Sequence, residues 1–322
     1  MTLAPRLAPF AASLAASLAA LLAPGMAAAA PFAYVPNEGS GTVSVIDTAT
    51  DLVVAEIPGG AKPRGTVVSL DGHRAYVSDQ PGNRLVVLDL DKRVQAGAIE
   101  LGASPEGMGM SADGRWIVAA VEEGNEVAFV DVAAQKKAFS VKVQGKNPEH
   151  AMFSPDGRRV FVSAEEGSAV DVIDVATRAV VAHIPVGERP RGIGFAPDGS
   201  RAWVGVENAS EVAVIDTATL KPVATLKAGT RSNGIAVHPD GRHVYVSNGG
   251  DATVSVVDTA TLKVVATIPV GQRPWNMALT PDGRKLYVAC GRAGVVSVID
   301  TEKMAKVADV PVGKLPWGVA IR

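Results

Sequence analysis

The sequence predicts an all-β protein, a single seven-bladed β-propeller of four-stranded antiparallel blades. Three observations support this prediction. A hydrophobic block that ends in Asp, TVSVID at residues 42–47, recurs seven times at intervals of 42 or 43 residues. Each interval contains four short runs with the composition of strands. Seven such units fill residues 31–322, so a chain whose 322 residues would suggest two domains by length alone forms one ring.

Two further markers recur in register with that block. One lies at the centre of a short apolar run, at Tyr34, Tyr76, Val118, Phe161, Trp203, Tyr245 and Tyr287. The other opens the first strand of a unit, at Pro63, Pro105, Pro148, Pro190, Ser232, Pro274 and Pro316. Several markers kept in one order along the chain indicate a true structural repeat.

The unit that begins at Pro190 shows how each strand is predicted. Strands are expected at 192–196, 202–204, 212–215 and 222–226. These runs alternate with period two and are rich in β-branched residues, as half-buried strands are. Asp198-Gly199 joins the first two strands because Gly accepts the positive φ of a tight hairpin. Asp216 begins an Asp-Thr-Ala-Thr turn that its side chain closes, so the repeated Asp residues are interpreted as turn chemistry.

The order of strands at the two ends of the repeat predicts how the ring closes. The repeat opens on a second strand around Tyr34 and ends on a first strand at 318–321. We expect this C-terminal inner strand to join the three N-terminal strands in one blade, because an unpaired edge would otherwise remain exposed.

Residues 1–29 have the composition of a secretory signal peptide, and residues 30–322 are assigned to the propeller. Arg6 is followed by an Ala/Leu run that is short for a membrane span. Small residues follow, and we expect cleavage near Ala28 or Ala29. The alternative is an uncleaved anchor. After cleavage the product would be periplasmic or secreted, with no membrane span.

Composition excludes several classes of function. The formal net charge is −2, which gives no indication of nucleic-acid binding. Cys290 is the single cysteine, so an intrachain disulfide, a thiolate zinc site and the CxxCH of covalent haem attachment are excluded. We expect no cofactor and no metal, and a monomer.

The motifs AYVSD, HVYVSN, TVSVIDTAT and SPDGR resemble those of the YVTN family of β-propeller repeat proteins, over residues 32–322. Within that family, the leader and the seven units look most like exported propellers associated with pyrroloquinoline-quinone-dependent alcohol catabolism. The resemblance implies an accessory role beside a quinoprotein dehydrogenase. The chain lacks the adjacent cysteines that such dehydrogenases place under the quinone, so it is not expected to be the dehydrogenase itself.

The candidate site is the mouth of the channel where the inner strands begin. The residue after each strand-opening marker varies while the framework stays constant, which favours a use other than packing: Arg64, Glu106, Glu149, Arg191, Asn233, Trp275 and Trp317. The residue before the marker adds Lys62, Arg189, Arg231 and Arg273. The sequence therefore predicts a cationic mouth for a planar anionic small molecule or an acidic protein surface. Seven merely solvated rim residues are the alternative.

One unit departs from the pattern. The segment from Asp131 to Pro148 is one residue longer than its equivalents, and His150 replaces the Gly of the Pro-x-Gly marker. His150 is predicted to face the mouth, as a structural residue or as a ligand contact. With Glu149 and Arg191 it could form the acid/base and anion-holding set of a lactone hydrolase. It could also offer one axial ligand to a haem.

The expected function is a non-catalytic exported propeller that binds a partner of a periplasmic quinoprotein alcohol oxidation system or a small anionic ligand. The alternative is a propeller lactonase using Glu149, His150 and Arg191. A third possibility is a purely structural propeller that binds no small molecule. Function has to be decided at the site, because one fold hosts many activities.

Overall fold

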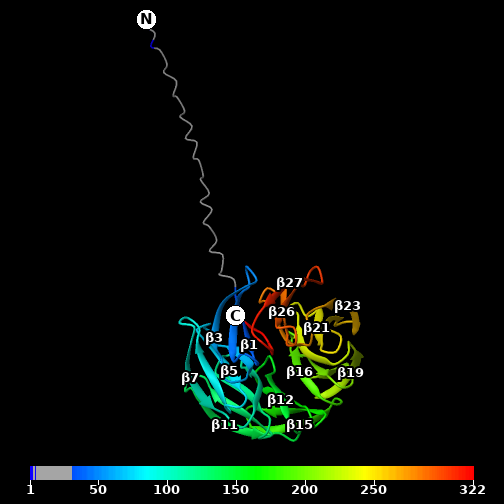
Figure 1. The fold of residues 1–322 in the computed structure, drawn as a ribbon. Helices are drawn as coiled ribbons and strands as arrows, with labels where there is room; N and C mark the ends of the chain where they lie inside the picture. Colours follow the sequence, from blue (N-terminus) through cyan, green and yellow to red (C-terminus); the bar gives the residue numbers. More distant parts are fainter. Residues whose placement is uncertain (3, 5–30) are drawn as a thin grey trace.

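Seven four-stranded antiparallel sheets stand around a central axis in a computed structural model of the protein (Figure 1). The structure describes residues 1–2, 4 and 31–322. The predicted seven-bladed, all-β propeller is confirmed over residues 31–322. The predicted leader and its cleavage site near Ala28 or Ala29 lie outside the described residues, apart from residues 1, 2 and 4. In the described part of the chain, no helix has the length and hydropathy needed to cross a membrane.

The blades follow one another in sequence order. Blade 1 contains β28 (Ala320–Ile321), β1 (Phe32–Asn37), β2 (Thr42–Asp47) and β3 (Leu52–Pro58). Blade 2 contains β4 (Pro63–Val68), β5 (Arg74–Asp79), β6 (Arg84–Asp89) and β7 (Val94–Glu100). Blade 3 contains β8 (Pro105–Met110), β9 (Trp116–Val121), β10 (Glu126–Asp131) and β11 (Lys136–Lys142). Blade 4 contains β12 (Pro148–Phe153), β13 (Arg159–Ala164), β14 (Ala169–Asp174) and β15 (Ala179–Pro185). Blade 5 contains β16 (Pro190–Phe195), β17 (Arg201–Val206), β18 (Glu211–Asp216) and β19 (Lys221–Lys227). Blade 6 contains β20 (Ser232–Val237), β21 (His243–Asn248), β22 (Thr253–Asp258) and β23 (Lys263–Pro269). Blade 7 contains β24 (Pro274–Leu279), β25 (Lys285–Cys290), β26 (Val295–Asp300) and β27 (Ala305–Pro311).

The repeated Asp residues make the turns that the sequence predicts. After β14, the Asp174 Oδ1 accepts hydrogen bonds from the Thr177 amide and hydroxyl, both at 2.8 Å. In the first turn of blade 2, the Asp71 Oδ1 accepts from the His73 amide at 3.0 Å. Hydrogen bonds from Ser69 and His73 lower the pKa of Asp71. The carboxylates therefore replace backbone partners at hairpin ends.

The hydrophobic core lies between blades. Each of the seven clusters of buried apolar residues joins side chains from two adjacent blades. Between blades 2 and 3, for example, Tyr76 and Leu85 pack with Met108 and Ile117. The central residue of each second strand, predicted as a marker, is at most 5% exposed. Burying both faces of a sheet in this way makes neighbouring blades depend on one another.

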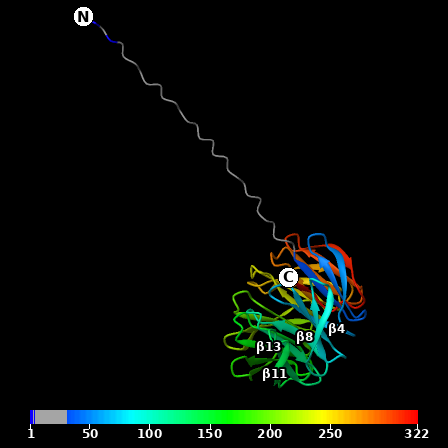
Figure 2. The same ribbon diagram turned by 90° about the vertical axis from the view of Figure 1, so that its left-hand side faces the viewer.

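The ring closes as predicted. β1 pairs with β28 through Ala33 opposite Ile321 and Tyr34 opposite Ala320. The Trp317 amide donates to the Pro36 carbonyl at 2.9 Å, which extends the contact toward the start of the inner strand. The red C-terminal segment lies beside the blue first blade in both views (Figures 1 and 2). The last described segment therefore completes the blade that the first one begins.

Candidate functional site

A polar pocket of about 390 Å³ occupies the mouth of the channel where the inner strands begin. We call it the mouth pocket. Its lining includes seven of the ten predicted site residues, namely Arg64, Glu149, Arg191, Asn233, Arg273, Trp275 and Trp317. The other three, Glu106, His150 and Arg231, are not among the residues that line it. The residues that line it come from all seven blades, as the repeat spacing predicts.

A repeated backbone turn precedes the inner strands and supplies three arginines of the mouth. Arg189, Arg231 and Arg273 stand just before the strand-opening marker of their blades, with φ of 60°, 60° and 57°. Such left-handed conformations are uncommon for residues with a side chain. Ser104, Asn147 and Leu315 adopt the same conformation at the equivalent positions. The geometry is thus a property of the repeat, and it brings successive arginines to the same rim.

Glu207, which directly follows β17, is the acceptor at which three arginines meet. Its Oε1 lies 2.9 Å from a nitrogen of Arg231 and 2.9 Å from Nη2 of Arg273, and its Oε2 lies 2.8 Å from Nε of Arg191. The side chain of Glu207 is 0% exposed. Burial alone would raise the pKa of Glu207, but Arg191 and Arg273 outweigh it and lower this pKa to about 2. Glu207 is therefore ionised and holds three blades together.

Arg191 uses its three guanidinium nitrogens on three different carboxylates. Nη1 lies 2.7 Å from Glu149, Nη2 lies 3.0 Å from Glu165, and Nε lies 2.8 Å from Glu207. Its side chain is only 12% exposed. A guanidinium fork held in this way is rigid and largely saturated with acceptors. Arg191 is consequently a fixed part of the pocket wall.

A second buried group joins blades 1, 2 and 3. The Arg64 guanidinium pairs with Glu106 and lies 3.3 Å from Glu38. Gln80 Nε2 donates to Glu106 Oε1 at 2.8 Å. The other carboxylate oxygen of Glu106 is buried and has no hydrogen-bond partner within the part of the chain that the structure describes. Burial and the nearby Glu149 carboxylate raise the pKa of Glu106 to about 8.

The structure corrects the prediction of a cationic mouth. All six predicted cations, Lys62, Arg64, Arg189, Arg191, Arg231 and Arg273, lie within 4.0 Å of a glutamate oxygen. Four of the glutamates at this mouth were missed, namely Glu38, Glu122, Glu165 and Glu207. They occupy one repeat position, directly after the second strand of their blades, and Gln80 stands at that position in blade 2. The repeat register at that position would have identified them. Six glutamates stand against the six cations, so the mouth does not carry the cationic excess that the inner-strand starts alone predict.

Blades 6 and 7 carry glycine where blades 1, 3, 4 and 5 carry these glutamates. A Cβ at Gly291 would lie 2.5 Å from Cζ3 of Trp275, and a Cβ at Gly249 would lie 3.0 Å from Nη1 of Arg273. The two glycines therefore leave the space that the indole and the guanidinium occupy. Glu122, Glu149 and Glu165 come from blades 3 and 4, while Trp275 and Arg273 belong to blade 7. Blade 7 thus presents an indole and a guanidinium to the mouth pocket where those blades present carboxylates.

Three carboxylates from blades 3 and 4 come close together at the mouth pocket. One oxygen each of Glu122, Glu149 and Glu165 lies within 4.8 Å of the others. Arg191 contacts two of the three carboxylates, and the Ser104 hydroxyl donates to Glu122 at 2.8 Å. Burial raises the pKa of Glu165, against the opposing effect of Arg191. The charge of this cluster is thus already offset by protein groups.

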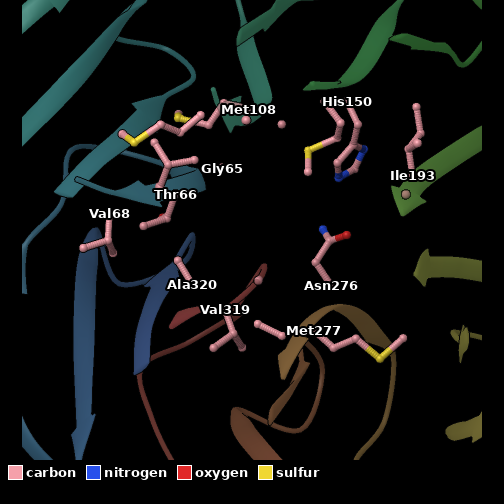
Figure 3. Close-up of a pocket in the computed structure, with 18 of the residues that line it drawn as sticks. Gly65, Thr66, Val68, Met108, His150, Ile193, Asn276, Met277, Val319 and Ala320 are labelled. Carbon is pink, nitrogen blue, oxygen red and sulfur yellow. The ribbon is translucent and has the colours of Figure 1, made fainter. Parts of the chain in front are cut away.

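His150 does not face the mouth pocket, which corrects the sequence prediction. It lines a second cavity of about 450 Å³ inside the channel (Figure 3). We call this the channel cavity. Arg64, Asn276 and Trp317 line both cavities and separate them. Glu149 and Arg191 line only the mouth pocket, so the three residues of the predicted lactonase set are divided between two spaces.

The propeller is shared with several solved structures of different activity. Hydrazine synthase of Kuenenia stuttgartiensis is 23% identical, with 83% of this chain and 92% of that chain covered and a TM-score of 0.77. A Bacteroides fragilis protein named as a "putative 6-phosphogluconolactonase" is 19% identical, with coverages of 93% and 100% and a TM-score of 0.78. A functionally unknown protein from Desulfotomaculum acetoxidans is 18% identical, with coverages of 90% and 98% and a TM-score of 0.80. At these identities the likeness shows the fold alone.

The comparison by sequence gives one family. Residues 3–321 match the model of the YNCE-like beta-propeller family. No curated protein matches the chain. The predicted propeller resemblance is confirmed at this level, and none of the comparisons links the chain to alcohol catabolism.

Proposed function

The chain belongs to the YNCE-like beta-propeller family, and we propose that it is a non-catalytic member that binds a small planar polar molecule in the mouth pocket. The observation that carries this proposal is the locked ion-pair network. Arg191 engages three carboxylates, and Glu207 lies within 4.0 Å of four arginines. Groups fixed in this way make a preorganised binding surface, because little side-chain freedom is lost when a ligand enters.

Trp275 and Arg189 define the ligand class. The indole of Trp275 lines the pocket and offers a flat apolar face for a planar ring. Among the arginines that line the pocket, Arg189 has a side chain that is 40% exposed, so it can still meet an anionic substituent. Because the carboxylates offset the arginines, a bare anion gains little here, and a planar ring with anionic and hydrogen-bonding groups fits better than a compact anion.

The test compares a planar and a non-planar tricarboxylate. Pyrroloquinoline quinone and citrate would each be titrated into the purified protein by calorimetry. We expect the planar compound to bind at least tenfold more tightly than citrate, and Trp275→Ala to remove most of that preference. Trp116→Ala is the control, because Trp116 lies on β9 outside the pocket lining. Equal weak binding of both compounds, or an unchanged preference in Trp275→Ala, would contradict the proposal.

An association with a periplasmic quinoprotein alcohol oxidation system is proposed on the sequence resemblance alone. Binding of a planar tricarboxylate in the mouth pocket, if the titration shows it, would support this association. The experiment is a pull-down with the tagged protein from the periplasm of alcohol-grown cells, with mass spectrometry of the captured material. Recovery of a quinoprotein dehydrogenase above an untagged control is the expected result. Its absence, together with absence of the protein from the periplasmic fraction, would overturn this assignment.

Lactone hydrolysis is the second candidate, favoured by the carboxylate cluster of Glu122, Glu149 and Glu165 and the raised pKa of Glu165. His150 and Glu149, two members of the predicted lactonase set, line different cavities, so the carboxylates of the mouth pocket are the residues to test first. Hydrolysis of a sugar lactone, with and without a divalent metal, decides between the candidates. Turnover that falls in Glu149→Gln or Glu165→Gln would favour the hydrolase. A protein that neither hydrolyses lactones nor binds either tricarboxylate would be a purely structural propeller.

A further inference from the structure

We propose that the channel cavity is a second ligand site, for an uncharged and mostly apolar small molecule that carries one hydroxyl group, held between His150 and Asn276. This site is separate from the mouth pocket and does not depend on the function proposed for it.

The two polar residues stand at one repeat position. The third residue of each strand-opening marker is Gly65, Gly107, His150, Gly192, Gly234, Asn276 and Gly318. Five of these seven positions thus bring no side chain to the ring. The side chains of His150, from β12, and Asn276, from β24, point toward each other across the channel cavity (Figure 3). Two side chains at equivalent positions of different blades form a pair that only the ring brings together.

His150 is buried without satisfying its ring nitrogens. The residue is 7% exposed, and neither Nδ1 nor Nε2 makes a hydrogen bond of full geometry among the described residues. The side chain of Asn276 is close enough for a weak contact that raises the pKa of the ring, but burial outweighs this contact. A buried polar group without a partner destabilises the folded protein, so a ligand that supplies the missing hydrogen bond is favoured. Burial lowers the pKa of His150, so its imidazole is neutral at pH 7 and offers one donor and one acceptor. A ligand hydroxyl is complementary to this ring, because it can donate a hydrogen bond to the acceptor nitrogen or accept one from the donor nitrogen.

The position of the ring is fixed by its neighbours. The imidazole stacks on the indole of Trp317, with centroids 5.3 Å apart and planes 16° from parallel. On the side of blade 3, a Cβ at Gly107 would lie 2.6 Å from Cδ2 of His150. Asn276 Nδ2 donates to the Trp317 carbonyl at 3.4 Å. A packed and oriented pair of this kind can bind without first being ordered.

The rest of the cavity selects for an uncharged, apolar body. Its walls include Met108, Met152, Ile193, Met277 and Val319 (Figure 3). Methionine side chains adapt to irregular apolar shapes and contact aromatic rings favourably. The charged residues among the lining are Arg64, which is paired with Glu38 and Glu106, and Arg322. An apolar cavity of this volume with a few convergent polar groups is the usual form of a small-molecule site.

The experiment uses 4-ethylphenol as the probe and ethylbenzene, which lacks the hydroxyl, as its matched control. Saturation-transfer NMR and calorimetry on the purified full-length protein would measure both. We expect 4-ethylphenol to bind at least tenfold more tightly, and its addition to shift the ring ¹⁵N resonances of His150. Absence of binding, or equal affinity for the two probes, would overturn the proposal.

Two variants test the residues and one controls for loss of histidine. His150→Gly and Asn276→Gly restore the residue that five units carry at this position, so both are compatible with the fold. Each is expected to reduce the preference for 4-ethylphenol to less than threefold. His73→Ala removes an exposed histidine of blade 2 and should leave it unchanged. If both glycine variants kept the wild-type preference for 4-ethylphenol over ethylbenzene, the proposal would be overturned. Trp275→Ala tests only the mouth pocket, so failure of one site is distinguishable from failure of the other.

Discussion

The imidazole of His150 stacks on the indole of Trp317 at a centroid distance of 5.3 Å, and this contact joins blade 4 to the C-terminal segment across the channel. Trp317 lines both cavities, whereas His150 lines only the inner one. The stacked pair therefore forms part of the partition between the mouth pocket and the channel cavity. Its two members come from the unit that departs from the repeat and from the segment that closes the ring.

Replacement of Trp317 tests the partition. Trp317 is 8% exposed, so Trp317→Ala removes a large buried ring and is expected to cost about 3 kcal/mol of unfolding free energy. Trp317→Phe keeps an aromatic face for His150 and should cost clearly less. Urea unfolding at pH 7 measures both values. Equal losses in the two variants would show that the stacked contact contributes nothing specific.

Gly107→Ala tests the close approach between blades 3 and 4. The new methyl group would lie 2.6 Å from Cδ2 of His150 and 2.8 Å from the Glu149 carbonyl oxygen, so a loss of about 1–3 kcal/mol is expected. Gly97→Ala is the matched control in the neighbouring blade 2, because nothing lies within 4 Å of a Cβ there. That substitution should leave the protein equally or slightly more stable. If Gly107→Ala did not lower the thermal stability of the protein, the tight packing around His150 would be contradicted.

Glu207→Gln tests the shared acceptor of three arginines. At pH 7 this variant is expected to lose about 3–5 kcal/mol, because buried guanidinium groups lose their common partner. The pKa of Glu207 is lowered to about 2 from an ordinary value of 4.5. A lowered folded-state pKa gives stability that is present above pH 4.5 and is lost as the pH falls toward 2. The difference between wild type and variant should therefore narrow between pH 4.5 and 2 in denaturant titrations, and a constant difference would contradict this ionisation.

Glu106→Gln should show the opposite dependence on pH. Burial and the Glu149 carboxylate raise the pKa of Glu106 to about 8, so the folded protein keeps a proton that the unfolded chain releases above pH 4.5. Wild type then loses stability relative to the variant as the pH rises from 4.5 to 8, by at most about 1.4 kcal/mol per pH unit. Unfolding at pH 5, 6.5 and 8 measures the change. A variant less stable than wild type at pH 8 would show that the ionised pair with Arg64 dominates instead.

The repeat made the fold predictable, and the same repeat explains what was missed at the site. Markers such as Tyr76 and Pro63 locate strands because burial and hairpin geometry repeat in each blade. The charge at the mouth depends on two segments of each blade, the start of the first strand and the residue after the second strand. The starts of the inner strands include Arg191 but not Glu165 and Glu207. These two glutamates follow the second strands and neutralise the charge of Arg191.

The depth of His150 could not be read from the sequence for a different reason. β12 pairs with β13 through an irregularity between Pro148 and His150, whereas blade 5 resumes its pairing only at Ile193. Asn276, at the same repeat position in blade 7, also lines the channel cavity, although its blade has the pairing pattern of blade 5. The repeat position therefore sets the direction of the side chain, and this position is glycine in five units, so the repeat shows no side chain from which the direction could be predicted. The inserted residue before Pro148 signals a difference in the blade, but not its direction.

The pairing of β1 with β28 also sets an order in time for folding. A chain made from its N-terminus can complete blades 2 to 7 before residues 320–321 exist, while β1, β2 and β3 wait as a three-stranded sheet. During that interval the inner edge of β1 has no partner, and it is open to a strand from another molecule. Joining residues so far apart in sequence is entropically slow. The final seam, rather than any single blade, therefore determines when the protein is protected from misassembly and proteolysis.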